Sequence, residues 1–191
     1  LPDGVPVIML SGRLTRWKGQ TLLLRALAKL DMNVRCLLVG SGRDEYQREL
    51  QELAKSLSIA DRVHVVGECK DMPAAYKLAD VVVSASTDPE AFGRVAVEGQ
   101  AMGRPVVAPD HGGAVEQIDH GETGWLFRHG DADDLARQLK QALSLNAEER
   151  QAFHDRAIEM VRKKYTNAQM CAATLDVYRE IIQMHKNKPK H

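Results

Sequence analysis

Short apolar runs alternate with amphipathic segments along the first two thirds of the chain. Most of these runs stop at glycine, serine or proline, as the first one does at Ser11-Gly12. A short apolar run bounded by turn residues is typical of a strand buried on both faces of a parallel sheet. The predicted strands are residues 5–10, 34–39, 63–66, 81–85, 105–108 and 125–127.

The segments between these runs carry apolar residues at helical spacing. Residues 20–30 place Leu23, Leu27 and Leu30 on one face, and the next such segment repeats the pattern. Asp71 is a suitable cap for the third helix, with Pro73 in its first turn. The expected helices in this part are residues 20–30, the segment containing Tyr46, Leu50, Leu53 and Leu57, the segment after Asp71, residues 93–102 and residues 114–118.

The last third of the chain is predicted to be helical. Asp131 is expected to cap one helix, while Asn146 with Glu149 and Thr166 with Gln169 have the spacing of capping boxes. The expected apolar faces are Leu135, Leu139 and Leu143, then Phe153, Ala157, Met160 and Val161, then Cys171, Leu175, Tyr178 and Ile182. We expect residues 186–191 to fray.

Strands that alternate with helices predict an α/β fold with a doubly wound parallel sheet of about six strands and helices on both faces. The length of 191 residues suits one such domain, for which we expect residues 1–185. Ligands of these sheets bind outside the carboxyl ends of the strands. The loops that follow the strands are therefore the places to search for chemistry.

The composition narrows the choice of partners. Lysine plus arginine and aspartate plus glutamate both total 26, so no net charge attracts nucleic acid or anionic lipid, and a phosphate site has to be local. No stretch has the apolar length of a membrane span. Cys36, Cys69 and Cys171 lack partners at metal spacing, and we expect reduced packing residues of a cytoplasmic protein. The chain does not begin with Met, so we expect a fragment.

The loop after the first strand is basic. Gly12 allows a ligand to approach the backbone, and Arg13 and Lys18 add a forked guanidinium and a point charge. This combination suits a diphosphate. Two solvated loop cations are the alternative interpretation, because most lysines and arginines are simply exposed.

The loop after the fourth strand leads into a helix and carries acids. Residues 92–94 lie at the expected helix start, where free backbone N–H groups attract an anion. Glu90 lies in the loop and Glu98 about two turns further along the chain. The flanks of Glu98 are apolar, so we expect it to be partly buried and to have a partner.

These residues occur in an order that resembles the nucleotide-sugar-binding half of glycosyltransferase family 4, also called the group 1 glycosyltransferases. The resemblance covers about residues 7–127 and continues weakly through the C-terminal helices. The motifs that carry it are Gly12-Arg13 with Lys18-Gly19, Glu90-Ala91-Phe92-Gly93 with Glu98, residues 103–108, and His111-Gly112-Gly113 with Glu116.

The resemblance implies a two-domain GT-B enzyme that is retaining, needs no metal or other cofactor, and uses a UDP-, GDP- or ADP-sugar. By motif position, Arg13 and Lys18 hold the diphosphate, Glu98 binds the ribose diol and Glu90 binds the transferred sugar, with Arg13, Lys18 and Glu90 as the catalytic set. The resemblance also places Gly12 and the backbone amides of Phe92, Gly93 and Arg94 in the donor site, and it places the base contact around residues 66–72.

The resemblance also sets expectations for the whole protein. An N-terminal acceptor domain is missing, and the acceptor is a glycan or lipid-linked molecule of cell-surface polysaccharide or lipopolysaccharide biosynthesis. We expect a cytoplasmic location, with peripheral contact at the cytoplasmic face of the inner membrane as an option. In the family, the last helix often returns to the acceptor domain. In this chain, the helix ending near Met184 is therefore expected to expose an apolar face, which would favour self-association.

Other interpretations fit less well. Asp131-Ala132-Asp133 resembles a metal-binding Asp-x-Asp motif, but helix capping explains it better. A nicotinamide dehydrogenase needs three spaced glycines after the first strand, and a P-loop ATPase needs Gly-Lys-Ser/Thr, and neither pattern occurs. His111 and Glu116 are weaker candidates for donor contact. A nucleotide-sugar-binding module without activity of its own remains the main alternative.

Overall fold

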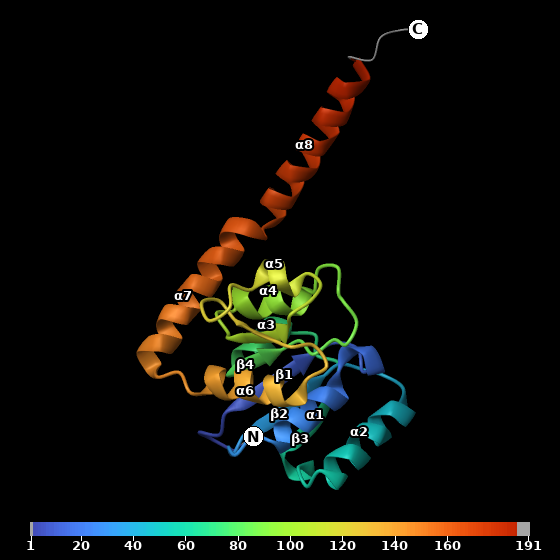
Figure 1. The fold of residues 1–191 in the computed structure, drawn as a ribbon, viewed down its shortest axis with the longest axis vertical. Coiled ribbons are helices and arrows are strands. Elements are labelled where there is room, and N and C mark those ends of the chain that lie inside the picture. Colours follow the sequence, from blue (N-terminus) through green and yellow to red (C-terminus); the bar gives the residue numbers. More distant parts are fainter. Residues whose placement is uncertain (1, 187–191) are drawn as a thin grey trace.

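Six parallel strands form the centre of the molecule (Figure 1). The computed structural model describes residues 2–186. The strands lie in the order β3-β2-β1-β4-β5-β6, which confirms the predicted sheet. Their bounds are β1 Val7–Ser11, β2 Arg35–Val39, β3 Val63–Gly67, β4 Val81–Val83, β5 Val106–Pro109 and β6 Trp125–Phe127.

The predicted strands are all present, with boundaries that differ by one or two residues at several ends. β1 begins at Val7 and not at residue 5, because its ladder with β2 starts with the pair Val7 and Arg35 and runs on to Ser11 and Val39. β4 ends at Val83 and not at residue 85. Periodicity finds a strand, whereas the hydrogen-bonded partners decide where it stops.

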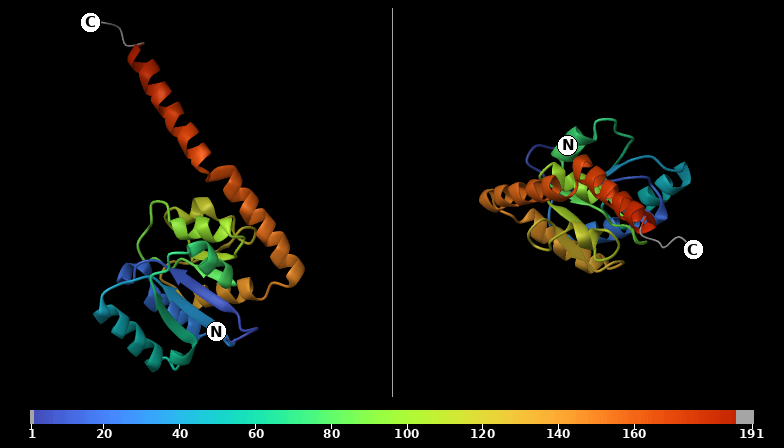
Figure 2. Two further views of the ribbon diagram at one scale, coloured as in Figure 1. Left: turned by 180° about the vertical axis from the view of Figure 1, so that it is seen from behind. Right: turned by 90° about the horizontal axis from the view of Figure 1, so that it is seen from above.

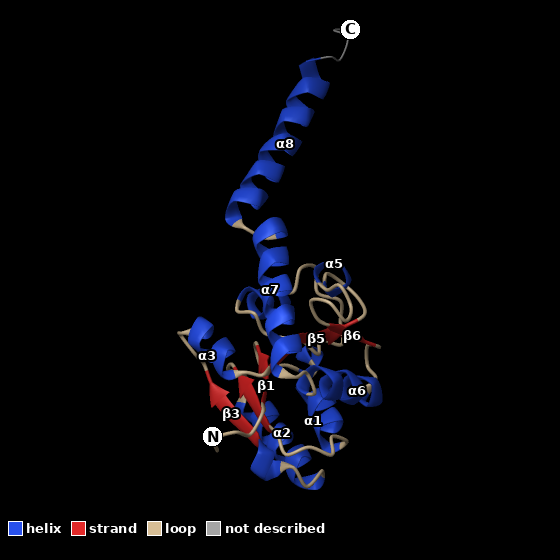
Figure 3. Ribbon diagram, turned by 90° about the vertical axis from the view of Figure 1, so that its left-hand side faces the viewer, coloured by secondary structure: helices blue, strands red, loops and turns tan. Residues whose placement is uncertain are grey.

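Helices cover both faces of the sheet (Figure 3). One core cluster joins α1, α2 and α6 to the side chains of Ile8 and Leu10, and a second joins α3 and α4 to Val7 and Met9 on the opposite face. The bounds are α1 Gln20–Ala28, α2 Asp44–Ser56, α3 Met72–Leu78, α4 Arg94–Ala101, α5 Ala114–Gln117 and α6 Ala132–Leu143, with short 3-10 helices η1 Arg16–Lys18 and η2 Ala60–Arg62.

Three of the predicted helix caps are present. Asp71 accepts a hydrogen bond from the backbone N–H of Ala74, and Asp131 accepts two from the first turn of α6. Asn146 and Glu149 form the complete capping box of α7, Ala147–Lys164. Each cap satisfies N–H groups that the first helical turn leaves without a partner.

Helix α7 is packed onto the sheet domain by aromatic stacking. Phe153 stacks on Trp125 of β6, with ring centroids 4.8 Å apart and planes 2° from parallel. Further along the helix, Met160 and Val161 pack on Val97 of α4. The apolar face predicted for this helix therefore faces the core.

Helix α8, Asn167–Lys186, projects away from the sheet domain (Figures 1 and 2). Thr166 supplies half of the predicted capping box, since its hydroxyl accepts the Gln169 N–H at 3.2 Å. The exposed apolar face that we expected is present, and self-association through it stays a prediction. Its large exposed side chains are Met170, Leu175, Val177, Tyr178, Ile181, Ile182 and Met184.

The three cysteines and the end of the chain agree only in part with their predictions. Cys36 is buried and the half-buried Cys69 packs against the second core cluster, whereas Cys171 on α8 is exposed. The prediction of three packing cysteines was therefore wrong for Cys171. Of the tail predicted to fray, residues 187–191 lie outside the described residues, and Lys186 is the last residue of α8. No helix within residues 2–186 is long and apolar enough to cross a membrane.

Candidate functional site

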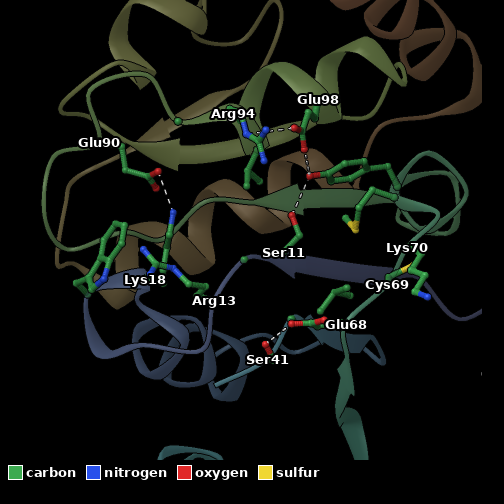
Figure 4. A pocket seen from close by; sticks show the side chains of 18 residues that line it. Ser11, Arg13, Lys18, Ser41, Glu68, Cys69, Lys70, Glu90, Arg94 and Glu98 are labelled. Carbon is green, nitrogen blue, oxygen red and sulfur yellow. Dashed lines mark hydrogen bonds and ion pairs between the residues drawn. The ribbon is translucent and has the colours of Figure 1, made fainter. Parts of the chain in front are cut away.

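A cleft of about 570 Å³ lies at the carboxyl ends of β1 and β2 and at the start of α4 (Figure 4). In the strand order, β1 pairs on one side with β2 and on the other with β4. The loops leaving β1 and β4 therefore diverge from adjacent strands, which is where doubly wound sheets bind ligands. The cleft is where the sequence predicted it, and it contains residues of the basic loop and of the acidic loop.

The basic side of the cleft is formed by Gly12, Arg13 and Lys18. Gly12 is held to the end of β2 by its N–H, which donates to the Val39 carbonyl at 2.9 Å. Lys18 is largely shielded from solvent, and its Nζ also lies 4.4 Å from the centroid of the Trp17 ring. A partly desolvated cation next to a ring is held more firmly than a surface lysine.

The acidic side is connected directly to this cation. The Glu90 carboxylate accepts a hydrogen bond from Lys18 Nζ at 2.9 Å and another from the Ser86 hydroxyl. The exposed fractions of the two charged side chains are only 14% for Lys18 and 20% for Glu90, so water screens this pair less than a surface pair. The structure thus unites two of the predicted residues, and it adds Ser86, which the sequence analysis missed.

Glu98 reaches the cleft from α4 and has the partner that its apolar flanks predicted. The Tyr76 hydroxyl lies 2.8 Å from Glu98 Oε2 and 2.9 Å from Ser11 Oγ. Tyr76 is 2% exposed, and burial is the main cause that raises the pKa of its hydroxyl above the usual value. The hydroxyl therefore keeps its proton at physiological pH and can donate a hydrogen bond to the carboxylate.

The start of α4 presents its backbone to the same cleft. Gly93 caps the helix at φ 73° with no side-chain hydrogen bond, and Gly93, Arg94 and Val95 line the cleft. The first-turn N–H groups are therefore available to an anion. Phe92 is not among the residues that line the cleft, and its ring packs edge-on against Tyr165 at 5.7 Å.

The loop after β3 closes the other end of the cleft with Glu68, Cys69 and Lys70. Ser41, which follows β2, donates a hydrogen bond to Glu68 at 2.6 Å and so ties the two loops together. This is the loop around residues 66–72 in which the resemblance places the base contact. The side chains of these residues lie on the side of the cleft opposite Glu90 (Figure 4).

The weaker candidates lie outside this cleft. His111 contacts the Ser86 carbonyl through Nε2 at 3.1 Å and lines a small neighbouring cavity with Glu90. Glu116 is exposed, and Asp131 caps α6 as expected. Within residues 2–186, no group of three or more His, Cys, Asp or Glu residues could hold a metal ion.

Residues 1–160 match the family described as glycosyl transferases group 1. The chain belongs to this family. A D-inositol 3-phosphate glycosyltransferase of Xylanimonas cellulosilytica is 34% identical to it over 193 residues, 99% of this chain and 45% of the relative. An N-acetyl-alpha-D-glucosaminyl L-malate synthase of Bacillus anthracis is 31% identical over 86% of this chain and 43% of the relative. This group 1 glycosyltransferase chain therefore spans about half the length of the curated relatives it matches.

Solved structures confirm the predicted GT-B fold of this group 1 glycosyltransferase chain. A glycosyltransferase of Rickettsia africae has a TM-score of 0.88 at 33% identity, covering 95% of this chain and 49% of that one. Anabaena HepE, in complex with UDP and glucose, has a TM-score of 0.84 at 32% identity, covering 91% and 48%. An isolated C-terminal domain from a group 1 protein of Francisella tularensis shares the fold over 85% of this chain and 89% of that one, with a TM-score of 0.73 at 23% identity.

Proposed function

We propose that this chain is the donor-binding domain of a retaining glycosyltransferase that works without a metal ion. In the proposed reaction, the bond from the anomeric carbon of a nucleotide-diphospho-sugar to the diphosphate oxygen breaks. A bond from that carbon to an acceptor hydroxyl oxygen forms on the same face, and a nucleoside diphosphate and a proton leave. Two of the matching proteins are about a third identical to this chain over the matched residues, and both carry glycosyltransferase names.

The observation that carries the proposal is the pairing of charges in one cleft. Arg13 and Lys18 supply two cations on one side, and the start of α4 supplies free N–H groups on the other. Glu90 and Glu98 supply carboxylates that accept hydrogen bonds from hydroxyl groups. A diphosphate flanked by two sugars has this same distribution of negative charge and hydroxyl groups.

Each part of the donor then has a partner. Arg13, Lys18 and the α4 N–H groups bind the diphosphate and stabilise the negative charge that develops as it leaves. Glu98 binds the ribose diol, Glu90 binds hydroxyls of the transferred sugar, and the loop after β3 contacts the base. Fixed cations and a helix start in a partly desolvated cleft supply the charge stabilisation that a metal ion gives elsewhere.

The whole protein is proposed to contain a second domain. Since the chain spans about half of its relatives, we assign the acceptor site to an N-terminal domain of the same protein. A glycan or lipid-linked acceptor of cell-surface polysaccharide or lipopolysaccharide biosynthesis, used at the cytoplasmic face of the inner membrane, completes the proposal. The chain by itself is then a nucleotide-sugar-binding module that transfers nothing.

A thermal-shift panel tests the donor site. UDP, GDP and ADP, each alone and as the glucose, N-acetylglucosamine and mannose derivatives, are added at millimolar concentration. We expect the nucleotides of one base to bind the folded chain and to raise its unfolding temperature. At one hundred times Kd, such binding adds about 2.7 kcal/mol to the free energy of unfolding. No stabilisation by any nucleotide would contradict the donor site, and donor hydrolysis or transfer at enzyme-like rates by this chain would contradict the inactive module.

A further inference from the structure

A chain of three hydrogen-bonding groups connects the sheet to Glu98. Ser11 is the last residue of β1, Tyr76 lies on α3 and Glu98 lies on α4. Ser11 Oγ is 2.9 Å from the Tyr76 hydroxyl, which is 2.8 Å from Glu98 Oε2. Ser11 and Tyr76 are 6% and 2% exposed, so this chain of hydrogen bonds is anchored in the core.

The direction of these hydrogen bonds follows from the chemistry of the groups. An ionised carboxylate only accepts, so the one proton of the Tyr76 hydroxyl goes to Glu98. The Ser11 hydroxyl then donates to the tyrosine oxygen. Hydroxyl groups linked in one direction polarise each other, which strengthens the last bond in the chain.

The other contact of Glu98 is much weaker. Arg94 Nε lies 3.7 Å from Glu98 Oε1, and the Arg94 side chain is 84% exposed. This distance is beyond a hydrogen bond, and a solvated i to i+4 pair contributes little. The orientation of the carboxylate therefore depends on the tyrosine, and Oε1 accepts no hydrogen bond from the described residues.

We propose that Tyr76 is a positioning residue: it holds the Glu98 carboxylate in the orientation that accepts the ribose hydroxyls of the donor. The inference rests on the proposed function of the cleft. It assigns to Tyr76 no contact with the donor itself. Its effect on binding is therefore transmitted through Glu98, and only to ligands that have the hydroxyls that Glu98 binds.

The test combines Tyr76→Phe with ligands that lack one ribose hydroxyl. Calorimetry measures Kd for UDP, GDP and ADP and for their 2′-deoxy forms, on the wild-type chain, Tyr76→Phe, Glu98→Ala and the double variant. We expect Tyr76→Phe to weaken the ribonucleotide about tenfold and the 2′-deoxynucleotide less than about threefold, which is the size of one charge-assisted hydrogen bond. In the Glu98→Ala background, Tyr76→Phe should change neither Kd by more than about twofold.

The outcomes separate the inference from the function on which it rests. Wild-type binding with equal loss of both nucleotide forms in Tyr76→Phe would overturn the positioning role and leave the donor site intact. Additive losses in the double variant would overturn it as well. Failure of the wild-type chain to bind any of the six nucleotides would overturn the donor site and the inference together.

A second variant covers the case in which Tyr76→Phe does not fold. Ser11→Ala removes the donor to the tyrosine oxygen and leaves the Tyr76 ring in place. We expect about a twofold to threefold loss for the ribonucleotide, a smaller loss for the 2′-deoxy form and an unchanged melting temperature within a few degrees. Equal affinity of Ser11→Ala and wild type for the ribonucleotide would contradict the proposed effect of the hydrogen bonds from Ser11 to Glu98.

Discussion

Lys18 and Glu90 hold each other across the cleft, with Nζ and a carboxylate oxygen 2.9 Å apart. The first residue is proposed to bind the diphosphate and the second to bind the transferred sugar. Their pairing makes the two ends of the donor interdependent, because any group that attracts Lys18 competes with the carboxylate. A nucleoside diphosphate and its sugar derivative should therefore respond in opposite ways to a change at Glu90.

Glu90→Gln separates these effects. Loss of the negative charge removes repulsion of the diphosphate and frees Lys18, so the bare nucleoside diphosphate should bind about threefold more tightly. The nucleotide sugar loses a charged acceptor for its hydroxyls and should bind more weakly. The affinity for the nucleotide sugar divided by the affinity for the nucleoside diphosphate should therefore fall about tenfold. Calorimetry with both ligands measures that ratio.

The control for this prediction is Glu49→Gln. Glu49 pairs with Arg16 at 2.5 Å on the surface, outside the residues that line the cleft. It removes the same charge and should leave both affinities within about twofold. Equal weakening of both ligands by Glu90→Gln would mean that the carboxylate positions Lys18 and does not bind sugar.

The two basic residues should distinguish nucleotides from nucleosides. Arg13→Ala and Lys18→Ala each remove a cation proposed to bind the diphosphate, so Kd for the nucleoside diphosphate should rise about tenfold. The nucleoside without phosphates should lose less than about twofold. Arg25→Ala, an exposed arginine on α1, is the matched control. A loss of nucleoside binding as large as the loss of diphosphate binding would contradict this assignment.

Much of the fold follows from periodicity. The six runs became six parallel strands because each is short, largely apolar and followed by a turn. Strands buried on both faces need no alternation, whereas the edge strand β3 leaves His64 and Val66 exposed. The caps Asp71 and Asp131 could be predicted because capping is local in sequence. Strand ends shifted because partner strands set them, as Arg35 does for Val7.

The site was predictable where its residues follow strands or match motifs of the family. Arg13, Lys18, Glu90 and Glu98 came from loop position and from the family resemblance, and the cleft contains all four. Tyr76 was missed because its role depends on packing between α3, β1 and α4, which lie apart in the sequence. A tyrosine on the sheet-facing side of a short capped helix was the available signal, but such a residue reads as core.

Alkylation of the three cysteines tests whether a nucleotide covers the loop after β3. Cys69 lines the cleft, Cys171 is exposed on α8, and burial raises the pKa of the Cys36 thiol to about 12. Because the thiolate reacts, Cys36 should stay unmodified by iodoacetamide in the folded chain at pH 8. A nucleoside diphosphate at ten times its Kd should slow modification of Cys69 roughly tenfold.

Peptide mass spectrometry reads the three sites separately. Cys171 is the internal control, since its position on α8 leaves its rate independent of the nucleotide. Protection of Cys69 would support contact of the base with the loop after β3. Unchanged modification of Cys69 at a nucleotide concentration that saturates binding would place the base elsewhere.

Gly19 ends η1 and caps α1 directly after Lys18. Its φ is 71°, and a Cβ built on it would lie 1.8 Å from the carbonyl oxygen of Ala85. Gly121 has a similar φ of 82° with no atom within 4 Å of its Cβ position.

Gly121→Ala should thus lower the free energy of unfolding by about 1 to 2 kcal/mol, for the left-handed backbone alone. Gly19→Ala should lower the free energy of unfolding by about 3 kcal/mol or more, because the backbone of the loop after β1 must move away from the backbone of Ala85. Urea unfolding compares the two variants, and equal losses would show that close approach to Ala85 does not hold the Lys18 loop in place.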